Sequence, residues 1–164
     1  MNFNEEHFIS AYEKYKDAIF RYCYFRLNNR ELALDAVQDI FIRTWRYLAA
    51  GNEIENIRAF CYKTARNAVV DYVRKSKKVK EESLELNLEQ GKEPAVSSRA
   101  EERVDFKLAL EIINSLDEPY QEAVILRYIE GFSPQEIAEI TQETANNISV
   151  RINRGLKKIK EQLQ

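Results

Sequence analysis

The sequence predicts an all-α protein made of two small helical domains joined by a flexible linker. Its 164 residues include only 4 Gly and 3 Pro, too few for the tight turns of a hairpin-rich β fold. Apolar residues make up 45% of the chain and charged residues 32%, so a packed core can form and wholesale disorder is disfavoured. Amphipathic helical patterns lie on both sides of a stretch that lacks one.

That stretch, residues 79–103, is the predicted linker. It contains Gly, Pro and Ser and few large apolar residues, with room for one short helical piece at Leu84–Leu88. The chain then divides into an N-terminal domain, residues 1–78, and a C-terminal domain, residues 104–164.

Charge is segregated along the chain, although the formal net charge is only −2. Residues 61–80 carry seven Lys or Arg and one Asp, and residues 144–164 carry five basic residues and one acidic residue. Between them, residues 81–118 carry eleven acidic and four basic residues. Charge runs can be solvated faces, but two basic helical segments around an acidic one favour a phosphate-binding protein.

The residues that usually carry catalysis or bind metals do not form a site in the sequence. Cys23 and Cys61 are far apart and are expected to be reduced core residues, and His7 has no local partner. No acid/base pair, metal set or Gly-rich phosphate loop appears, so we expect no enzyme, no metal and no cofactor. No apolar run approaches the roughly 20 residues of a membrane span, and no signal segment is seen, so we expect a soluble, cytoplasmic protein.

The first strong amphipathic pattern predicts a helix over residues 31–49. At about 100° per residue, one broad apolar face forms. Its members are Val37, Ile40, Phe41, Trp45 and Leu48. The opposite face gathers Asp35, Gln38, Asp39, Ile42 and Arg46. An isoleucine among polar residues indicates a contact surface, and the alternative is an ordinary solvated face with one stray apolar side chain.

A second helical pattern covers residues 58–77. One side gathers Cys61, Thr64, Ala65, Ala68 and Tyr72. The other side gathers Lys63, Asn67, Val70 and Arg74, with Phe60 near its edge. Cations can bind phosphates, an amide can read a base edge and a ring can stack on an unpaired base. The alternative is a core helix with a solvated basic tail.

The C-terminal domain begins with two predicted helices. The first covers Leu108–Leu116, and Pro119 then suits the first turn of the second helix, Pro119–Ile129. Gly131 is expected to end that second helix.

Two cap signals predict the last pair of helices. Ser133 is expected to cap a short helix, Pro134–Ile140, with Glu136 closing a capping box, and Thr144 to cap a helix that runs nearly to the end. The last helix has a narrow apolar stripe made of Ile148, Ile152, Leu156, Ile159 and Leu163. Its separate polar face holds Asn147, Arg151, Arg154 and Lys158. A short helix, a turn and a longer helix with a basic face are typical of the helix-turn-helix.

The order of these features resembles the bacterial RNA polymerase sigma factors of the small extracytoplasmic-function type. Residues 35–45 (DAVQDIFIRTW) are similar to region 2.2, and residues 57–74 (IRAFCYKTARNAVVDYVR) to regions 2.3 and 2.4. Residues 116–127 (LDEPYQEAVILR) and 131–138 (GFSPQEIA), with the last helix, are similar to region 4. The chain departs from frequent family residues at Phe60, Cys61, Thr64, Gln142, Gly155 and Leu156.

The resemblance implies a transcription initiation factor that binds core RNA polymerase and directs it to promoters through a −10 and a −35 element. Residues 1–78 would be sigma region 2 and residues 104–164 sigma region 4. The residues implied to contact the clamp helices of the largest polymerase subunit are Asp35, Gln38, Asp39, Ile42 and Arg46. Those implied to bind and open the −10 element are Phe60, Lys63, Arg66, Asn67, Asp71, Arg74 and Lys75. Those implied to bind the −35 element are Thr144, Asn146, Asn147, Ser149, Arg151, Asn153, Arg154 and Lys158.

The resemblance also implies further partners. Region 4 would contact the polymerase flap, the acidic linker would run through the RNA exit path, and an anti-sigma factor is expected, with no small-molecule substrate. Within the last helix, Arg154 is expected to contact a base, and the alternative is an ion pair with an acidic residue such as Glu139.

Two other protein classes compete with this interpretation. A stand-alone helix-turn-helix regulator would leave the mixed face of residues 58–77 unexplained. A helical adaptor that binds only proteins would bind no promoter. An enzyme is the weakest option.

Overall fold

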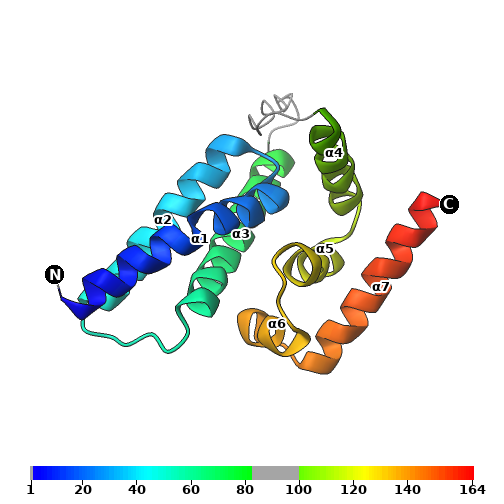
Figure 1. Cartoon of the computed structure of the whole chain (residues 1–164). Coiled ribbons are helices and arrows are strands. Elements are labelled where there is room, and N and C mark those ends of the chain that lie inside the picture. The colour runs from blue at the N-terminus through cyan, green and yellow to red at the C-terminus, as the bar shows by residue number, and fades with distance from the viewer. Residues whose placement is uncertain (1, 83–99) are drawn as a thin grey trace. The chain divides into compact units, whose positions relative to one another are not determined.

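The structure is a computed structural model that describes residues 2–82 and 100–164, and within them the side chains of residues 2–79 and 105–164. Every regular element in these described ranges is helical, which confirms the all-α prediction (Figure 1). The chain divides into two compact units, residues 1–92 and 93–164, each with its own core. Most of the predicted linker, with the helical piece at Leu84–Leu88, lies outside the described residues.

Unit 1 opens with a long helix, α1 (Phe3–Leu27), for which the sequence pattern made no prediction. Asn2 caps its start in a capping box, and Asn28 ends it in the left-handed conformation at φ 49°. Apolar side chains are spread around α1, from exposed Ile9 to fully buried Ile19, so no single stripe marks the helix in the sequence.

The second helix, α2 (Arg30–Ala49), follows almost at once because Asn29 accepts a hydrogen bond from the Leu32 amide at 3.1 Å. Its predicted apolar face lies toward the core: Ile40, Phe41 and Leu48 are buried, and Val37 and Trp45 are half-buried. Thr44 is also buried on α2, where its hydroxyl donates to the Ile40 carbonyl at 2.8 Å. The prediction for this helix is confirmed.

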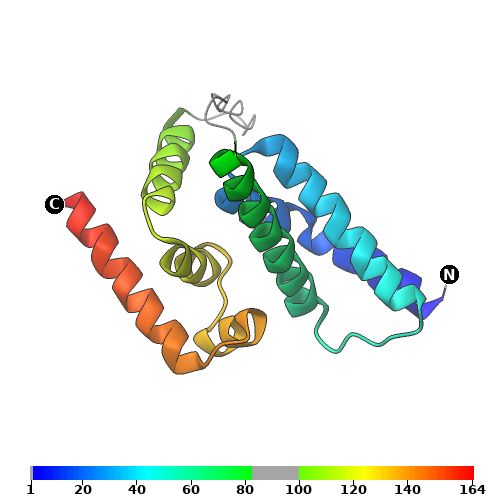
Figure 2. The same ribbon diagram turned by 180° about the vertical axis from the view of Figure 1, so that it is seen from behind.

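The third helix, α3 (Ile57–Glu82), packs against both α1 and α2 and extends past the predicted end at residue 77 (Figures 1 and 2). The predicted apolar side of this helix, which grouped Tyr72 with Cys61 and Ala65, was partly wrong. Tyr72 is 40% exposed, while Tyr62 and Val69 are buried with Cys61 and Ala65. The core-facing side of α3 is therefore rotated from the one that the small residues suggested.

Unit 2 begins with α4 (Ala100–Asn114) and α5 (Glu118–Val124). Helix α4 is longer than the predicted Leu108–Leu116 and starts inside the predicted linker. Helix α5 passes into one π-helical turn, η1 (Ile125–Ile129), so the predicted helix over 119–129 is not α-helical throughout. The backbone then turns at Gly131, whose φ of 78° suits glycine.

The helix-turn-helix consists of α6 (Pro134–Thr141) and α7 (Ala145–Leu163), which pack against each other. Both predicted caps are confirmed: Ser133 accepts from the Glu136 amide at 3.2 Å, and Thr144 from the Asn147 amide at 3.1 Å. Helix α7 also packs along α5 (Figure 1). Its apolar stripe is buried at Ile148 and Ile152, half-buried at Leu156 and Ile159, and exposed at Leu163.

Candidate nucleic-acid and protein interfaces

The predicted contact face of α2 is open to solvent. Asp35, Gln38 and Arg46 are exposed, and Ile42 is 48% exposed among them. Asp39 differs from its neighbours because it is half-buried and its carboxylate accepts from Arg43 Nε at 2.8 Å. That ion pair joins one turn of α2 to the next and partly neutralises Asp39.

An apolar groove continues this face onto α1, which the sequence patterns did not indicate. The groove has a volume of about 540 Å³ and is lined by Glu5, Phe8, Ile9, Tyr12, Gln38, Phe41, Ile42 and Trp45. Ring contacts shape its floor: the centroid of Phe8 lies 5.3 Å from that of Trp45, and that of Tyr12 lies 5.0 Å from that of Phe41. Phe8 and Tyr12 lie one helical turn apart on α1, and this spacing places both rings on the same side of the helix.

The basic face of α3 is also exposed. Lys63, Asn67 and Arg74 are exposed as their shared side of the helix predicts, while Phe60 and Arg66 are half-buried. Lysine, arginine and amide side chains can bind phosphates and base edges here without first breaking a core contact.

Phe60 has an aromatic partner that the sequence did not reveal. Its ring centroid lies 4.9 Å from that of Tyr47 at the end of α2. Tyr47 is itself exposed, so the pair forms an aromatic surface beside the start of α3. Such a surface can support an unstacked base.

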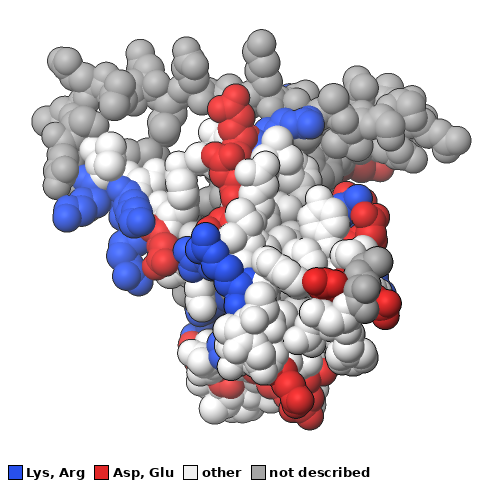
Figure 3. Space-filling view, turned by 90° about the vertical axis from the view of Figure 1, so that its left-hand side faces the viewer, with Lys and Arg blue, Asp and Glu red and all other residues white. Residues whose placement is uncertain are grey.

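A second hollow brings the two predicted interfaces of unit 1 together. It has a volume of about 240 Å³, and Asp35 and Asp39 of α2 line it together with Asp71, Tyr72 and Lys75 of α3. The hollow therefore places the α2 residues implied to bind polymerase beside the α3 residues implied to bind DNA. In Figure 3, the largest group of Lys and Arg lies on the left of the face shown, and Asp and Glu lie at its upper centre, on its right and at its lower edge.

The polar face of α7 is presented by the turn before it. Gln142 ends α6 in the left-handed conformation at φ 58°, and the Glu143 amide donates to the Ala138 carbonyl at 3.1 Å. The predicted residues of α7 lie on its accessible surface. Thr144, Asn146, Asn147, Asn153, Arg154 and Lys158 are exposed, and Ser149 and Arg151 are half-buried.

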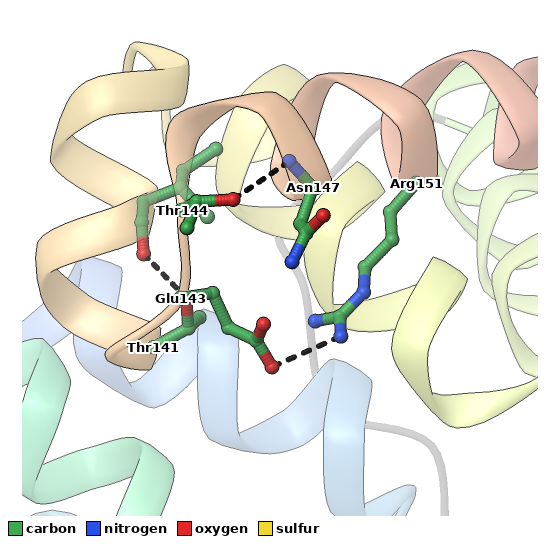
Figure 4. Close-up of polar contacts among 6 residues, drawn as sticks. Thr141, Glu143, Thr144, Asn147 and Arg151 are labelled. Carbon is green, nitrogen blue, oxygen red and sulfur yellow. Dashed lines mark hydrogen bonds and ion pairs between the residues drawn. The ribbon is translucent and has the colours of Figure 1, made fainter.

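Two cations of α7 have partners within unit 2. Arg151 Nη2 donates to Glu143 Oε1 at 2.9 Å (Figure 4). Lys158 Nζ lies 5.2 Å from the centroid of the Tyr120 ring on α5. Arg154 is exposed and, within the part of the chain that the structure describes, does not pair with Glu139. On the polar face of α7, the ion pair with an acidic residue is therefore made by Arg151 and not by Arg154.

Neither cysteine is placed for nucleophilic chemistry. Cys23 and Cys61 are both free and buried. Burial raises the pKa of the Cys61 thiol from 9.0 to about 11, opposed in part by its contact with Thr44 at 3.9 Å. Among residues 2–79 and 105–164, no three His, Cys, Asp or Glu side chains lie close enough together to hold a metal ion. No helix in the described ranges has the length and apolar character of a membrane span.

Comparison with known proteins agrees with this arrangement. Residues 11–79 match the family Sigma-70 region 2, and residues 106–159 match the family Sigma-70, region 4. The RNA polymerase sigma factor SigV of Bacillus subtilis (strain 168) is 29% identical over 161 residues, which cover 94% of this chain and 90% of that protein. The ECF RNA polymerase sigma factor SigW of the same strain is 26% identical over 170 residues, covering 98% and 91%.

The fold is also found in a solved structure. The sigma factor RpoE, crystallised with the anti-sigma factor NepR from Bartonella quintana, is 22% identical and superposes with a TM-score of 0.81 over 96% of this chain and 97% of that one. Two regions of one family, matched in order over most of the chain, do not favour a stand-alone regulator. The protein therefore belongs to the sigma-70 family of transcription initiation factors and is of the extracytoplasmic-function type.

Proposed function

We propose that unit 1 docks on core RNA polymerase through Asp35, Gln38, Asp39, Ile42 and Arg46 together with the apolar groove. The groove supports this because it shares Gln38 and Ile42 with the predicted contact face. An apolar side chain of the polymerase clamp would fill the groove, and the polar rim would fix its orientation.

Promoter DNA is proposed to contact both units. The face of α3 with Phe60, Lys63, Arg66, Asn67, Asp71, Arg74 and Lys75 binds and opens the −10 element, with Asn67 holding an unpaired base. Unstacking costs a few kcal/mol per step, so the phosphate contacts and the aromatic surface of Phe60 must offset it.

The observation that carries the promoter role is the capped helix α7. Its cap is closed by Thr144 and its polar face is accessible, as major-groove reading requires. The proposed −35 contacts are Thr144, Asn146, Asn147, Ser149, Arg151, Asn153, Arg154 and Lys158. Residues 104–164 would also contact the polymerase flap, and the linker, residues 79–103, would follow the RNA exit path.

The remaining partners follow from the same family role. An anti-sigma factor is a proposed partner because the solved relatives RpoE and CnrH are in complex with NepR and with the cytosolic domain of CnrY. The protein would act in the cytoplasm, as an initiation factor without catalysis of its own and without a small-molecule substrate.

Reconstitution with core RNA polymerase tests the proposal. The full chain is mixed with bacterial core enzyme, complex formation is measured by co-elution, and run-off transcription is measured on a promoter library. We expect core binding and initiation at a subset of promoters that core enzyme alone ignores. DNA binding without initiation would instead support the stand-alone regulator, and core binding without promoter selection would support the adaptor.

A further inference from the structure

The turn between α6 and α7 holds a carboxylate against the recognition helix. Glu143 Oε1 accepts from Arg151 Nη2 at 2.9 Å, and each side chain is 30% exposed (Figure 4). A pair that is partly withdrawn from water is screened less than one on an open surface, and a charge-assisted hydrogen bond is stronger than a neutral one.

The backbone fixes where this carboxylate lies. The Glu143 amide donates to the Ala138 carbonyl, and the next residue, Thr144, caps α7. Arg151 lies two turns into α7, on the same face as Asn147. The pair therefore links the turn to the part of a recognition helix that reaches base edges.

The Glu143 carboxylate weakens the general electrostatic attraction of α7 for DNA. Residues 144–164 carry five basic residues and one acidic residue, which suits phosphate binding, and Glu143 lowers the positive potential beside them. A group that weakens general attraction to DNA but holds a base-reading side chain improves discrimination between sequences.

Arg151 keeps donors for a base after it has bonded to Glu143. A guanidinium has five N–H donors, and the ion pair uses one Nη2 donor. Two further donors match O6 and N7 of guanine in the major groove, provided that the plane of the guanidinium is held correctly.

We propose that Glu143 is a positioning residue that orients Arg151 to read one guanine of the −35 element, so that it sets sequence preference rather than affinity. This inference rests on the proposed function of α7. It assigns to the turn a role in specificity in addition to its role in connecting two helices.

The test measures preference one base pair at a time. The full chain, assembled with core RNA polymerase, selects from duplex DNA randomised in the upstream element, and the preference at each position is read by sequencing. Glu143→Ala should lower the preference at one position by at least about fivefold, the position that Arg151→Ala also flattens. Binding to scrambled DNA should stay equal or tighten. Glu143→Gln, which retains an acceptor, should keep part of the preference.

Two controls separate positioning from a structural effect. In an Arg151→Ala background, Glu143→Ala should change no preference at any position. Arg154→Ala should flatten a different position. The inference is overturned if Glu143→Ala leaves every preference unchanged, or if it weakens all positions alike with a lowered melting temperature. If the wild-type holoenzyme selects no upstream element, the proposed function itself has failed, and that result is seen before any variant is compared.

Discussion

Asn67 lies on the exposed side of α3, one turn from Lys63 and two turns from Arg74. Its amide can donate and accept, so it can bond an unpaired base while the cations hold the phosphates. We expect Asn67→Ala to reduce open-complex formation on a duplex promoter by roughly fivefold, the worth of about one hydrogen bond. Footprinting of open complexes checks this. A template with a pre-melted bubble should be affected less, and an equal loss on both templates would contradict the role.

Cys61 gives a pH-dependent part of the stability of unit 1. The folded thiol has its pKa raised to about 11 by burial, against an ordinary value of 9.0. Between these values the native state binds more protons than the unfolded state, so the free energy of unfolding falls as pH rises. The stability that depends on the neutral Cys61 thiol is fully present below pH 9.0 and is lost as the pH rises past about 11.

Denaturant unfolding of the wild type and of Cys61→Ala, each measured at several pH values from neutral to strongly alkaline, checks this. The wild type should lose up to about 1.4 kcal/mol per pH unit more than the variant in that window. Because both proteins share every other ionisable group, the contribution of Cys61 is the difference between their two pH profiles. Parallel pH profiles would show that Cys61 ionises as freely as an exposed thiol.

At the scale of elements, the contact between α5 and α7 depends on a glycine. A Cβ at Gly155 would lie 2.8 Å from Val124 Cγ2 and 3.6 Å from Tyr120 Cβ. The valine side chain is stiff, so an added methyl group cannot be accommodated by a rotamer change alone. The close approach that Gly155 permits also brings Lys158 near the Tyr120 ring.

We therefore expect Gly155→Ala to destabilise unit 2 by about 1–3 kcal/mol, although alanine is the better helix former by about 1 kcal/mol. Thermal and denaturant unfolding measure the loss. In a double-mutant cycle, Val124→Ala should reduce the cost of the Gly155 substitution by removing the clashing methyl group. An unchanged or higher melting temperature for Gly155→Ala would mean that α7 moves away from α5 freely.

Structural features that depend on residues close together in the sequence were predictable from the sequence alone. The caps at Ser133 and Thr144 depend on residues three positions apart, so the sequence alone indicates them. Helix α1 was missed because its apolar residues surround the helix. The predicted helix over residues 119–129 ends in a π-helical turn, which its apolar pattern did not distinguish from an α-helical one. The Glu143–Arg151 pair joins residues eight apart across a turn whose geometry the sequence does not show.

At the scale of the whole molecule, the groove and the contact face of α2 form one surface on unit 1. Ile42, 48% exposed, belongs to both, while Leu34 on the same helix is 43% exposed and lines neither the groove nor the hollow. These two side chains are a matched pair for testing the polymerase contact. Asp39 is a less direct probe because its substitution would also break its ion pair with Arg43.

Ile42→Asp should weaken core polymerase binding by at least about tenfold, because an ionised group would be buried in the interface. Leu34→Asp should leave binding near the wild-type value. Both side chains are about half-exposed, so the two changes should lower the free energy of unfolding by similar amounts, about 1 kcal/mol each. Equilibrium titration of labelled protein with core enzyme measures the affinities. Equal affinities for the two variants would exclude this surface from the contact.

The burial of both thiols limits how an oxidant can act on this protein. The chain contains two cysteines, and each has 0% of its surface accessible. An oxidant dissolved in the cell reacts with accessible thiolates, so it cannot act on the folded protein at either sulfur. An oxidant that modifies either thiol would therefore have to act on an opened state of unit 1, after the helices around that thiol have separated.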